Sequence, residues 1–117
     1  MAKHPLKRLP AAFYRSISGA EPVREWLKDL SPADRQVIGF DIATAEFGWP
    51  VGMPLCRSLG DGLWEIRSNL PNGRIARVLF CVSAGHMFLL HGFQKRSRKT
   101  PLEALKWARK RQKEVEL

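Results

Sequence analysis

The chain has 117 residues, of which 44% are hydrophobic, and its 20 lysines and arginines outnumber 11 acidic residues to give a net charge of +9. This length predicts one domain, residues 1–117, with a single modest core, and the hydrophobic content argues against disorder. No apolar run approaches the roughly 20 residues that cross a bilayer, and no apolar block of signal-peptide length follows the basic N-terminus. We therefore expect a cytoplasmic protein without a membrane segment.

The charge is unevenly distributed along the chain. Residues 16–54 carry three cations and six acids, a net of −3, whereas residues 93–117 carry nine cations and three acids, a net of +6. Clustered cations attract phosphate groups and release counterions on binding. The pattern favours a nucleic-acid partner, with a solvated basic surface as the alternative interpretation.

The cysteines indicate neither a disulfide framework nor a metal site. Cys56 and Cys81 are not part of a CxxC motif, and no histidine or cysteine stands at metal-ligand spacing. No pair of carboxylates stands at metal-binding spacing either. We expect two free, buried thiols, no bound metal and no cofactor.

The N-terminal part predicts a flexible arm, a strand and a helix. Two prolines break residues 1–10, and residues 11–17 have the composition of a short strand. Pro22 suits the first position of a helix, because its missing N–H costs nothing there. An apolar stripe at i, i+3, i+4 and i+7 then predicts the helix, and consists of Val23, Trp26, Leu27 and Leu30.

A second helix is predicted directly after the first. Ser31 suits the N-cap and Asp34 the positive end of the helix dipole, and the helix should stop before Gly48. The two helices should form an antiparallel hairpin. We expect the aromatic residues Trp26 and Phe40 to pack in its core.

The remainder predicts a β-meander and a last helix. Four strand-like segments separated by turn residues cover residues 55–59, 63–68, 74–82 and 86–93. Thr100 and Glu103 have the spacing of a capping box around Pro101, and predict a final helix to about Glu114, with Leu102 facing inward. This order predicts an α+β fold: a small, mainly antiparallel sheet with an N-terminal helical hairpin and a C-terminal helix, the helices on one face.

Alternation along the strands should bring charged side chains to one face of the sheet. We assume that the first hairpin turn pairs Ser68 with Arg74. Arg77 then lies opposite Glu65 and diagonal to Arg67. A slip of one residue would move the strand's side chains to the other face, so the grouping depends on this register.

The next hairpin extends the same group. We assume that its turn pairs Val82 with His86. His91 then lies opposite Arg77, Phe93 follows on the same face, and Lys95 stands just beyond.

Such a group suits cleavage of RNA by its own 2′-hydroxyl. The hydroxyl must lose a proton, the phosphorane charge must be neutralised, and the leaving 5′-oxygen must gain a proton. Guanidinium groups suit the second task, a lysine or histidine with a shifted pKa suits the other two, and an aromatic ring can stack on a base. The candidate catalytic residues are Arg67, Arg77, His91, Phe93 and Lys95, and the candidate RNA-binding residues are Arg57, Arg74, Arg96, Arg98 and Lys99.

Structural roles remain open for these residues. Arg67 and Glu65 could simply belong to a cross-strand charge set, and His91 could be a hydrogen-bonded structural histidine. Phe93 could belong to the core, and residues 95–99 could form a solvated basic loop.

Four motifs carry a family resemblance. LWEIR at residues 63–67, ARVLF at 76–80, LLHGF at 89–93 and KRSRKTP at 95–101 resemble phage-derived HigB-like toxins of the RelE/ParE superfamily, whose pattern is LWELR, YRVLY, LLHGFxKK and KTP. The likeness covers about residues 13–114. Ala76 replaces the usual tyrosine of YRVLY, and Arg96 takes the second lysine position.

The resemblance implies a RelE-like fold and the toxin of a type II toxin–antitoxin pair. Such toxins enter the ribosomal A site and cut mRNA there without a metal, and a helix-turn-helix antitoxin neutralises them. Arg67 matches the arginine that closes LWELR, which is linked to phosphate stabilisation, and Arg77 matches the arginine of YRVLY. Phe93 and Lys95 match the aromatic and basic positions after LLHG, and Lys99 matches the lysine of KTP.

Two other functions fit the same residues. The first is a ParE-like toxin that inhibits DNA gyrase, although such a protein needs no phosphate-directed arginines on its sheet. The second is a non-catalytic module that binds RNA or DNA.

Overall fold

A computed structural model describes residues 6–95 and 99–116. A 3-10 turn, Pro71–Gly73, joins β3 to β4. The helices and strands are β1 (Ala11–Phe13), α1 (Pro22–Lys28), α2 (Pro32–Gly48), β2 (Cys56–Gly60), β3 (Leu63–Asn69), β4 (Ile75–Ser83), β5 (His86–Lys95) and α3 (Leu102–Val115).

The strands form one sheet in the order β1-β5-β4-β3-β2. The three neighbouring pairs from β2 to β5 are antiparallel, and β1 runs parallel to β5 at the edge. The α+β class and the mainly antiparallel sheet are therefore confirmed. Strand β1 is shorter than predicted, because the chain leaves the sheet after Phe13.

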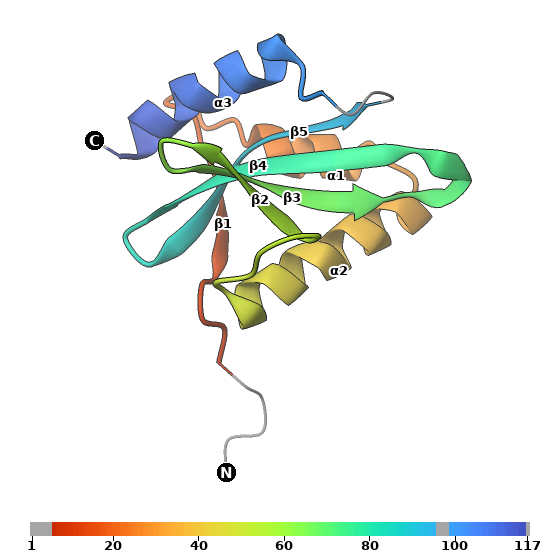
Figure 1. Ribbon diagram of the computed structural model, residues 1–117. Coiled ribbons are helices and arrows are strands. Elements are labelled where there is room, and N and C mark those ends of the chain that lie inside the picture. The colour runs from red at the N-terminus through yellow and green to blue at the C-terminus, as the bar shows by residue number, and fades with distance from the viewer. Residues whose placement is uncertain (1–5, 96–98, 117) are drawn as a thin grey trace.

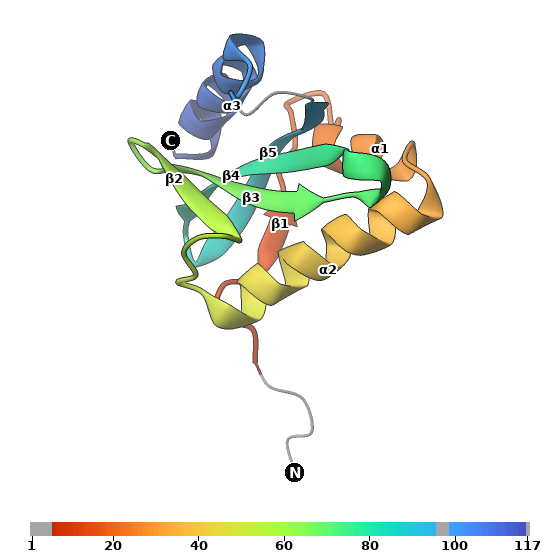
Figure 2. The ribbon, with the colours of Figure 1, turned by 45° about the vertical axis from the view of Figure 1, so that its right-hand side comes forward.

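The helices cover both faces of the sheet, so the prediction of helices on one face is wrong. Helices α1 and α2 pack on one side, and α3 packs on the other (Figures 1 and 2). Alternate residues of β3 show this division, because Ile66 belongs to the core under α1 and α2 whereas Leu63 belongs to the core under α3. None of the described helices is long and apolar enough to span a membrane.

The β3–β4 hairpin has a different register from the assumed one. Ser68 pairs with Ala76, not with Arg74, so Arg67 lies directly opposite Arg77. The error is two residues. Because strand side chains alternate with a period of two, the shift leaves Glu65, Arg67 and Arg77 on the same face.

The β4–β5 hairpin differs in the same way, but in two steps. Its turn pairs Ser83 with His86, one residue away from the assumed register. A bulge then adds Leu90 to β5, because Phe80 pairs with Leu89 whereas the preceding Leu79 pairs with His91. The bulge restores the predicted face for the end of β5.

The helix termini were predicted with mixed success. The Ser31 hydroxyl accepts a hydrogen bond from the Asp34 N–H at 3.2 Å, which confirms the N-cap of α2. The capping box at Thr100 is wrong, because Pro101 is the N-cap of α3 and no side chain caps it. The Thr100 hydroxyl lies 3.4 Å from a carboxylate oxygen of Glu65 on the sheet.

Trp26 packs against the core as predicted, but Phe40 does not. The six-membered ring of Trp26 passes so close to Gly92 on β5 that a Cβ built there would lie 2.4 Å from it. Phe40 is 72% exposed on the outer side of α2, and Leu102 is also exposed. Both predictions failed because each side chain lies on the side of its helix opposite the buried residues.

Two further predictions concern the cysteines and the N-terminal arm. Cys56 and Cys81 are free and buried, as expected. Residues 1–5 of the arm lie outside the described part of the chain. Leu9, within the described part, is buried and donates its N–H to the Glu46 carbonyl of α2.

Candidate functional site

The predicted charged side chains meet at one end of the sheet. This is the end where β3 and β5 finish and β4 begins, beyond the N-terminal end of α3 (Figure 1). Arg77 lies between Arg67 on one neighbouring strand and Phe93 on the other, and Lys95 pairs with Ile75 two residues further along. All four side chains share one face.

Glu65 lies at the centre of this group. One of its carboxylate oxygens, Oε2, accepts a hydrogen bond from Arg67 Nη1 at 3.1 Å and lies 3.9 Å from Arg77 Nε. The other, Oε1, faces the Thr100 hydroxyl. Arg57 on β2 lies directly opposite Glu65. We call Arg57, Glu65, Arg67, Arg77 and Lys95 the cation cluster.

The cation cluster is mostly buried, although its residues were predicted only to share one face of the sheet. Glu65 is fully buried, and Arg77 and Lys95 are only 4% and 6% exposed. Arg67 is half-buried and Arg57 is exposed, so these two present the positive charge to solvent. Four cations therefore surround one carboxylate.

Arg77 has an excess hydrogen-bond donor. Its Nη1 donates to the Ala76 carbonyl at 2.8 Å, but its buried Nε–H has no acceptor among the described residues. A buried donor without an acceptor is unfavourable by about 1–3 kcal/mol. The cluster can therefore accommodate a further anionic acceptor if its surroundings open.

The cluster shifts the ionisation of its own members. Burial lowers the pKa of the Lys95 ammonium, and the positive charges of Arg77, Arg67 and Arg57 lower it further, with Glu65 opposing them. Burial and the Arg67 charge likewise lower the pKa of Arg77. A lysine with a lowered pKa gives up its proton more readily near neutral pH.

His91 lies on the same face of the sheet as the cation cluster, but its neighbours are on α3. It pairs with Leu79, not with Arg77 as predicted. Arg111 Nη1 lies 3.2 Å from His91 Nδ1, and the His91 ring stacks on Phe93 with 5.8 Å between centroids. Burial and the Arg111 charge lower the pKa of His91, so the ring is neutral at pH 7.

The predicted RNA-binding cations are divided. Arg57 belongs to the cation cluster, and Lys99 is exposed just before α3. Arg74 lies apart, because its guanidinium binds both carboxylate oxygens of Asp34 on α2, on the other face of the sheet. Arg96 and Arg98 lie outside the described residues.

Sequence reasoning recognised Glu65 as a neighbour of the arginines but not as the centre of the site, and it assigned Thr100 to a helix cap. A signal for Glu65 exists in the sequence. An acid that alternates with apolar and basic residues in a buried strand needs cationic partners, since buried charges are otherwise costly. Thr100 carries no such signal, because its contact depends on where α3 docks.

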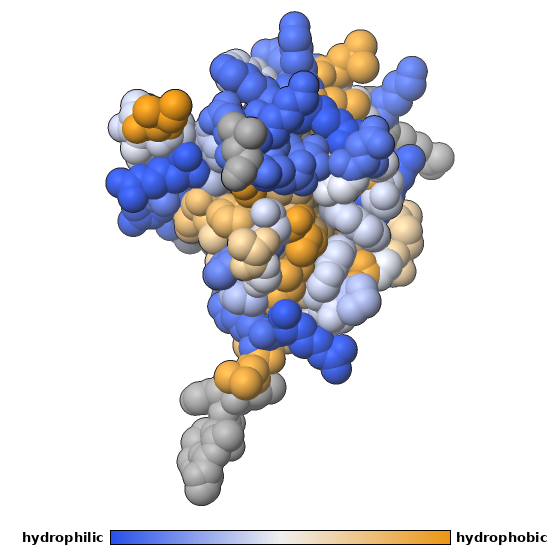
Figure 3. All heavy atoms as spheres, turned by 90° about the vertical axis from the view of Figure 1, so that its left-hand side faces the viewer, coloured by the Kyte–Doolittle hydropathy of each residue, from blue (hydrophilic) through white to orange (hydrophobic). Residues whose placement is uncertain are grey.

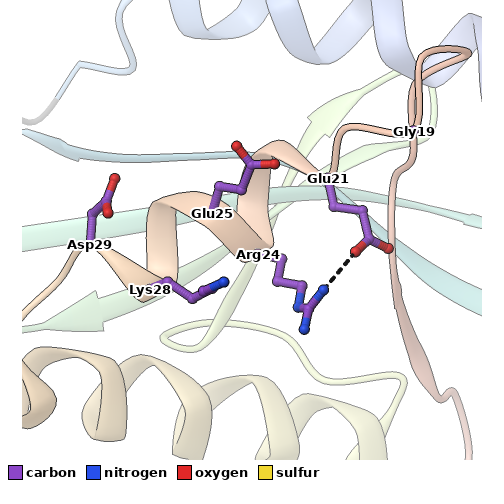
Figure 4. Close-up of a pocket in the computed structure, with 6 residues that line it drawn as sticks. All are labelled: Gly19, Glu21, Arg24, Glu25, Lys28 and Asp29. Carbon is purple, nitrogen blue, oxygen red and sulfur yellow. Dashed lines mark hydrogen bonds and ion pairs between the residues drawn. The ribbon is translucent and has the colours of Figure 1, made fainter.

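Several surface hollows lie away from the cation cluster. One of about 400 Å³ lies along α1 and is lined by Gly19, Glu21, Arg24, Glu25, Lys28 and Asp29 (Figure 4). An Arg24–Glu21 ion pair already occupies part of it. Figure 3 shows mainly hydrophilic residues over α3 and a hydrophobic strip below them. Within the described ranges, no group of three histidine, cysteine or acidic side chains is placed to hold a metal.

A protein-family model matches the chain. The family described as phage derived protein Gp49-like (DUF891) matches residues 25–113, which include β2 to β5, the whole cation cluster and most of α3. No curated protein matches the chain. The matched region spans well over half of the sequence. The chain therefore belongs to the Gp49-like family of phage-derived proteins, a family of toxin–antitoxin toxins in the RelE/HigB class.

Proposed function

We propose that this protein is the toxin of a type II toxin–antitoxin pair and that it cleaves mRNA on the ribosome without a metal. The observation that carries the proposal is the cation cluster, in which four cations surround a single buried carboxylate. Its family is associated with toxins that act as RNases. RNA supplies the phosphate that such an excess of positive charge requires.

The cluster offers a group for charge neutralisation and a group for proton transfer. Arg67 reaches solvent and can bind a non-bridging phosphate oxygen, while Arg77 adds positive charge from below. Lys95, with its lowered pKa, can accept the proton of the 2′-hydroxyl. The 2′-oxygen then bonds to phosphorus, and the bond to the 5′-oxygen breaks as that oxygen takes a proton from water, leaving a 2′,3′-cyclic phosphate and a 5′-hydroxyl.

The roles of His91 and Phe93 follow from their packing. His91 is neutral and held by Arg111, which suits positioning better than transfer of a proton from an imidazolium ion. Phe93 lies beside Arg77 and stacks on His91. In this proposal the free edge of the Phe93 ring contacts a nucleobase next to the scissile phosphate.

The partners are proposed on the same basis. They are mRNA in the ribosomal A site and a cognate helix-turn-helix antitoxin, and the protein would act in the cytoplasm. Membership of a toxin–antitoxin family supports an antitoxin partner. A short gene for a helix-turn-helix protein beside this one would support the pair.

The proposal is tested by Arg67→Ala, with Arg15→Ala as the matched control. Arg15 is an exposed arginine far from the cluster in the sequence. Removing a group that stabilises transition-state charge costs about 100-fold or more in rate. We expect Arg67→Ala to abolish growth inhibition and in-frame mRNA cuts, measured by mapping mRNA ends after induction, and Arg15→Ala to leave both unchanged.

Two outcomes would contradict the proposal. The first is an Arg67→Ala protein that folds and is still fully toxic. The second is double-strand breaks in DNA with intact mRNA, which would support gyrase inhibition instead.

A further inference from the structure

The cations of α3 fall into two groups. Arg109 and Arg111 are bound to the sheet: Arg109 donates to the Leu59 and Gly60 carbonyls of β2, and Arg111 donates to the Leu90 carbonyl at 2.8 Å. These arginines hold α3 in place. The lysines Lys106, Lys110 and Lys113 are exposed and form no ion pair within the described part of the chain.

Trp107 lies among these lysines and is 42% exposed. The Lys110 ammonium lies 5.4 Å from the centre of its ring, and the Arg111 guanidinium lies 4.9 Å from it. Cation–π contacts therefore hold the Trp107 ring in place at the surface, although the ring is only partly buried. We call Lys106, Trp107, Lys110 and Lys113 the α3 strip.

Hollows lie on both sides of Trp107. One of about 480 Å³ is lined by Glu103, Lys106, Trp107 and Lys110. The other, of about 210 Å³, lies between α3 and the segment that follows β1, and its lining includes Tyr14, Trp107 and Arg111. Lys110 and Arg111 lie over the ring, so a flat group that enters either hollow would contact Trp107 together with the Lys110 side chain.

The acids nearby do not cancel the charge of the strip. Glu114 accepts a hydrogen bond from the Tyr14 hydroxyl at 2.5 Å, which directs its carboxylate toward β1. Glu103 lines the larger hollow with Lys106 and Lys110, but it forms no ion pair with them among the described residues. The three lysines remain directed at solvent.

The strip begins a few residues along the chain from the cation cluster. The Thr100 hydroxyl contacts Glu65 within the cluster, and α3 starts two residues later. Lys106 stands little more than one helical turn into α3. An RNA strand bound at the cluster can therefore pass the exposed Lys99 and run along the strip.

We propose that the α3 strip is a second contact for single-stranded RNA, with a nucleobase on Trp107 and phosphates on Lys106 and Lys110. Aromatic rings interleaved with cations bind single strands in this way without sequence preference. The inference rests on the proposed function, which supplies RNA as the ligand. It adds a site that holds flanking nucleotides and takes no part in the chemistry.

The experiment compares two RNA lengths. We expect an oligonucleotide of about three nucleotides to occupy only the cation cluster and one of about twelve to reach the strip as well. Both carry 2′-O-methyl groups to prevent cleavage, and binding is measured by fluorescence anisotropy over a series of salt concentrations. The variants are Trp107→Ala, Trp107→Phe and the triple variant Lys106→Ala, Lys110→Ala and Lys113→Ala.

We expect Trp107→Ala to weaken binding of the longer RNA about tenfold or more and to leave the shorter RNA unaffected. Trp107→Phe should recover most of the loss, because it keeps an aromatic face. For the longer RNA, the slope of log binding constant against log salt concentration should become shallower by about two in the triple variant, at roughly 0.7 per lysine. The charge-matched control Lys7→Ala, Lys28→Ala and Arg35→Ala should change neither quantity.

Several results would overturn the inference. Equal binding of the longer RNA by the wild type and by both strip variants is one. A second contradicting result is that the strip variants bind a polyglutamate peptide more weakly than the wild type does but bind RNA equally well. That result would assign the strip to an acidic protein partner. Arg67→Ala separates this inference from the proposed function. It should weaken binding of the shorter RNA, but the longer RNA should still bind more tightly than the shorter one by the same factor as in the wild type.

Discussion

The two faces of the sheet are built from alternate residues of the same strands, yet they serve different ends. On the α1 and α2 side, Ile66, Val78 and Phe80 lie in an apolar core. On the α3 side, Leu63 and Leu79 are apolar, but Glu65, Arg67 and Arg77 bring charge into the same layer. One face therefore stabilises the sheet, and the other uses the resulting rigidity to hold like charges together.

The difference lies in what covers each face. Two helices extend the apolar core along the first face, with Trp49 against Phe80 at 5.5 Å between ring centroids. On the second face, the apolar contacts of α3 end near Leu79, and the charged residues begin there. Cations are tolerated on this face because α3 covers it only partly and the Glu65 carboxylate offsets part of their positive charge.

The largest effect on stability should come from the apolar face. Phe80→Ala removes a fully buried ring, and substitutions of this kind cost about 3–5 kcal/mol. We expect a much lower urea midpoint for unfolding. Arg67→Ala should lower that midpoint less, because Arg77 still lies beside the Glu65 carboxylate, while it abolishes cleavage. Similar losses of stability in both variants would remove the distinction between the faces.

Glu65→Gln should have the next largest effect. It keeps the shape of the side chain but removes the only carboxylate of the cation cluster. Because Arg67 can still reach water, we expect a loss of about 1–3 kcal/mol, smaller than for Phe80→Ala. Cleavage should also fall, since the arginines lose their common anchor. The exposed acid Glu103 provides the control, Glu103→Gln, which should change neither.

The pH dependence of cleavage should identify Lys95. Only its neutral form accepts a proton, so the single-turnover rate on preassembled ribosome complexes should rise with pH. The apparent pKa should lie below the ordinary lysine value of 10.5, because burial and the arginines lower it. Lys95→Arg, which stays protonated, should abolish the rise, and Lys106→Arg should not. A wild-type rate independent of pH would assign proton transfer to another group.

The smallest effect should come from the ion pair on the opposite face. Arg74 lowers the pKa of Asp34, so this pair stabilises the fold above the unfolded carboxyl's pKa of 3.8 and ceases to do so as the pH falls through the lowered value. Asp34→Asn should therefore lower Tm slightly at pH 7 and not at strongly acidic pH, and Asp29→Asn on the exposed end of α1 is the control.

Cleavage provides a second measurement on this pair. With Arg74 in a structural role, Arg74→Ala and Asp34→Asn should leave the rate equally unaffected. A loss of cleavage in Arg74→Ala alone would restore the predicted RNA contact of Arg74.

Much of the fold could be predicted from local patterns, because caps, turns and periodicity act over a few residues. Ser31 caps α2 as expected, and the four strands of the meander lie where their alternation indicated. The failures involve partners distant in the sequence. Thr100 contacts Glu65, and Phe40 is exposed, since neither outcome follows from the adjacent residues.

The grouping of Arg67, Arg77 and Lys95 on one face was predicted with a register that is wrong by two residues in both hairpins. It survived because side-chain direction depends only on whether a shift is odd or even. In the second hairpin the shift is even only because Leu90 forms a bulge. Without that residue, Phe93 and Lys95 would point toward α1.

The sequence by itself determined the order of the elements, the alternation within each strand and the supply of cations around Glu65. Tertiary structure alone decided the strand register, the side of the sheet that α3 covers and the burial of Arg77 and Lys95. The physical reason is that alternation is a property of each strand, whereas register and burial are set by contacts between segments far apart in the chain.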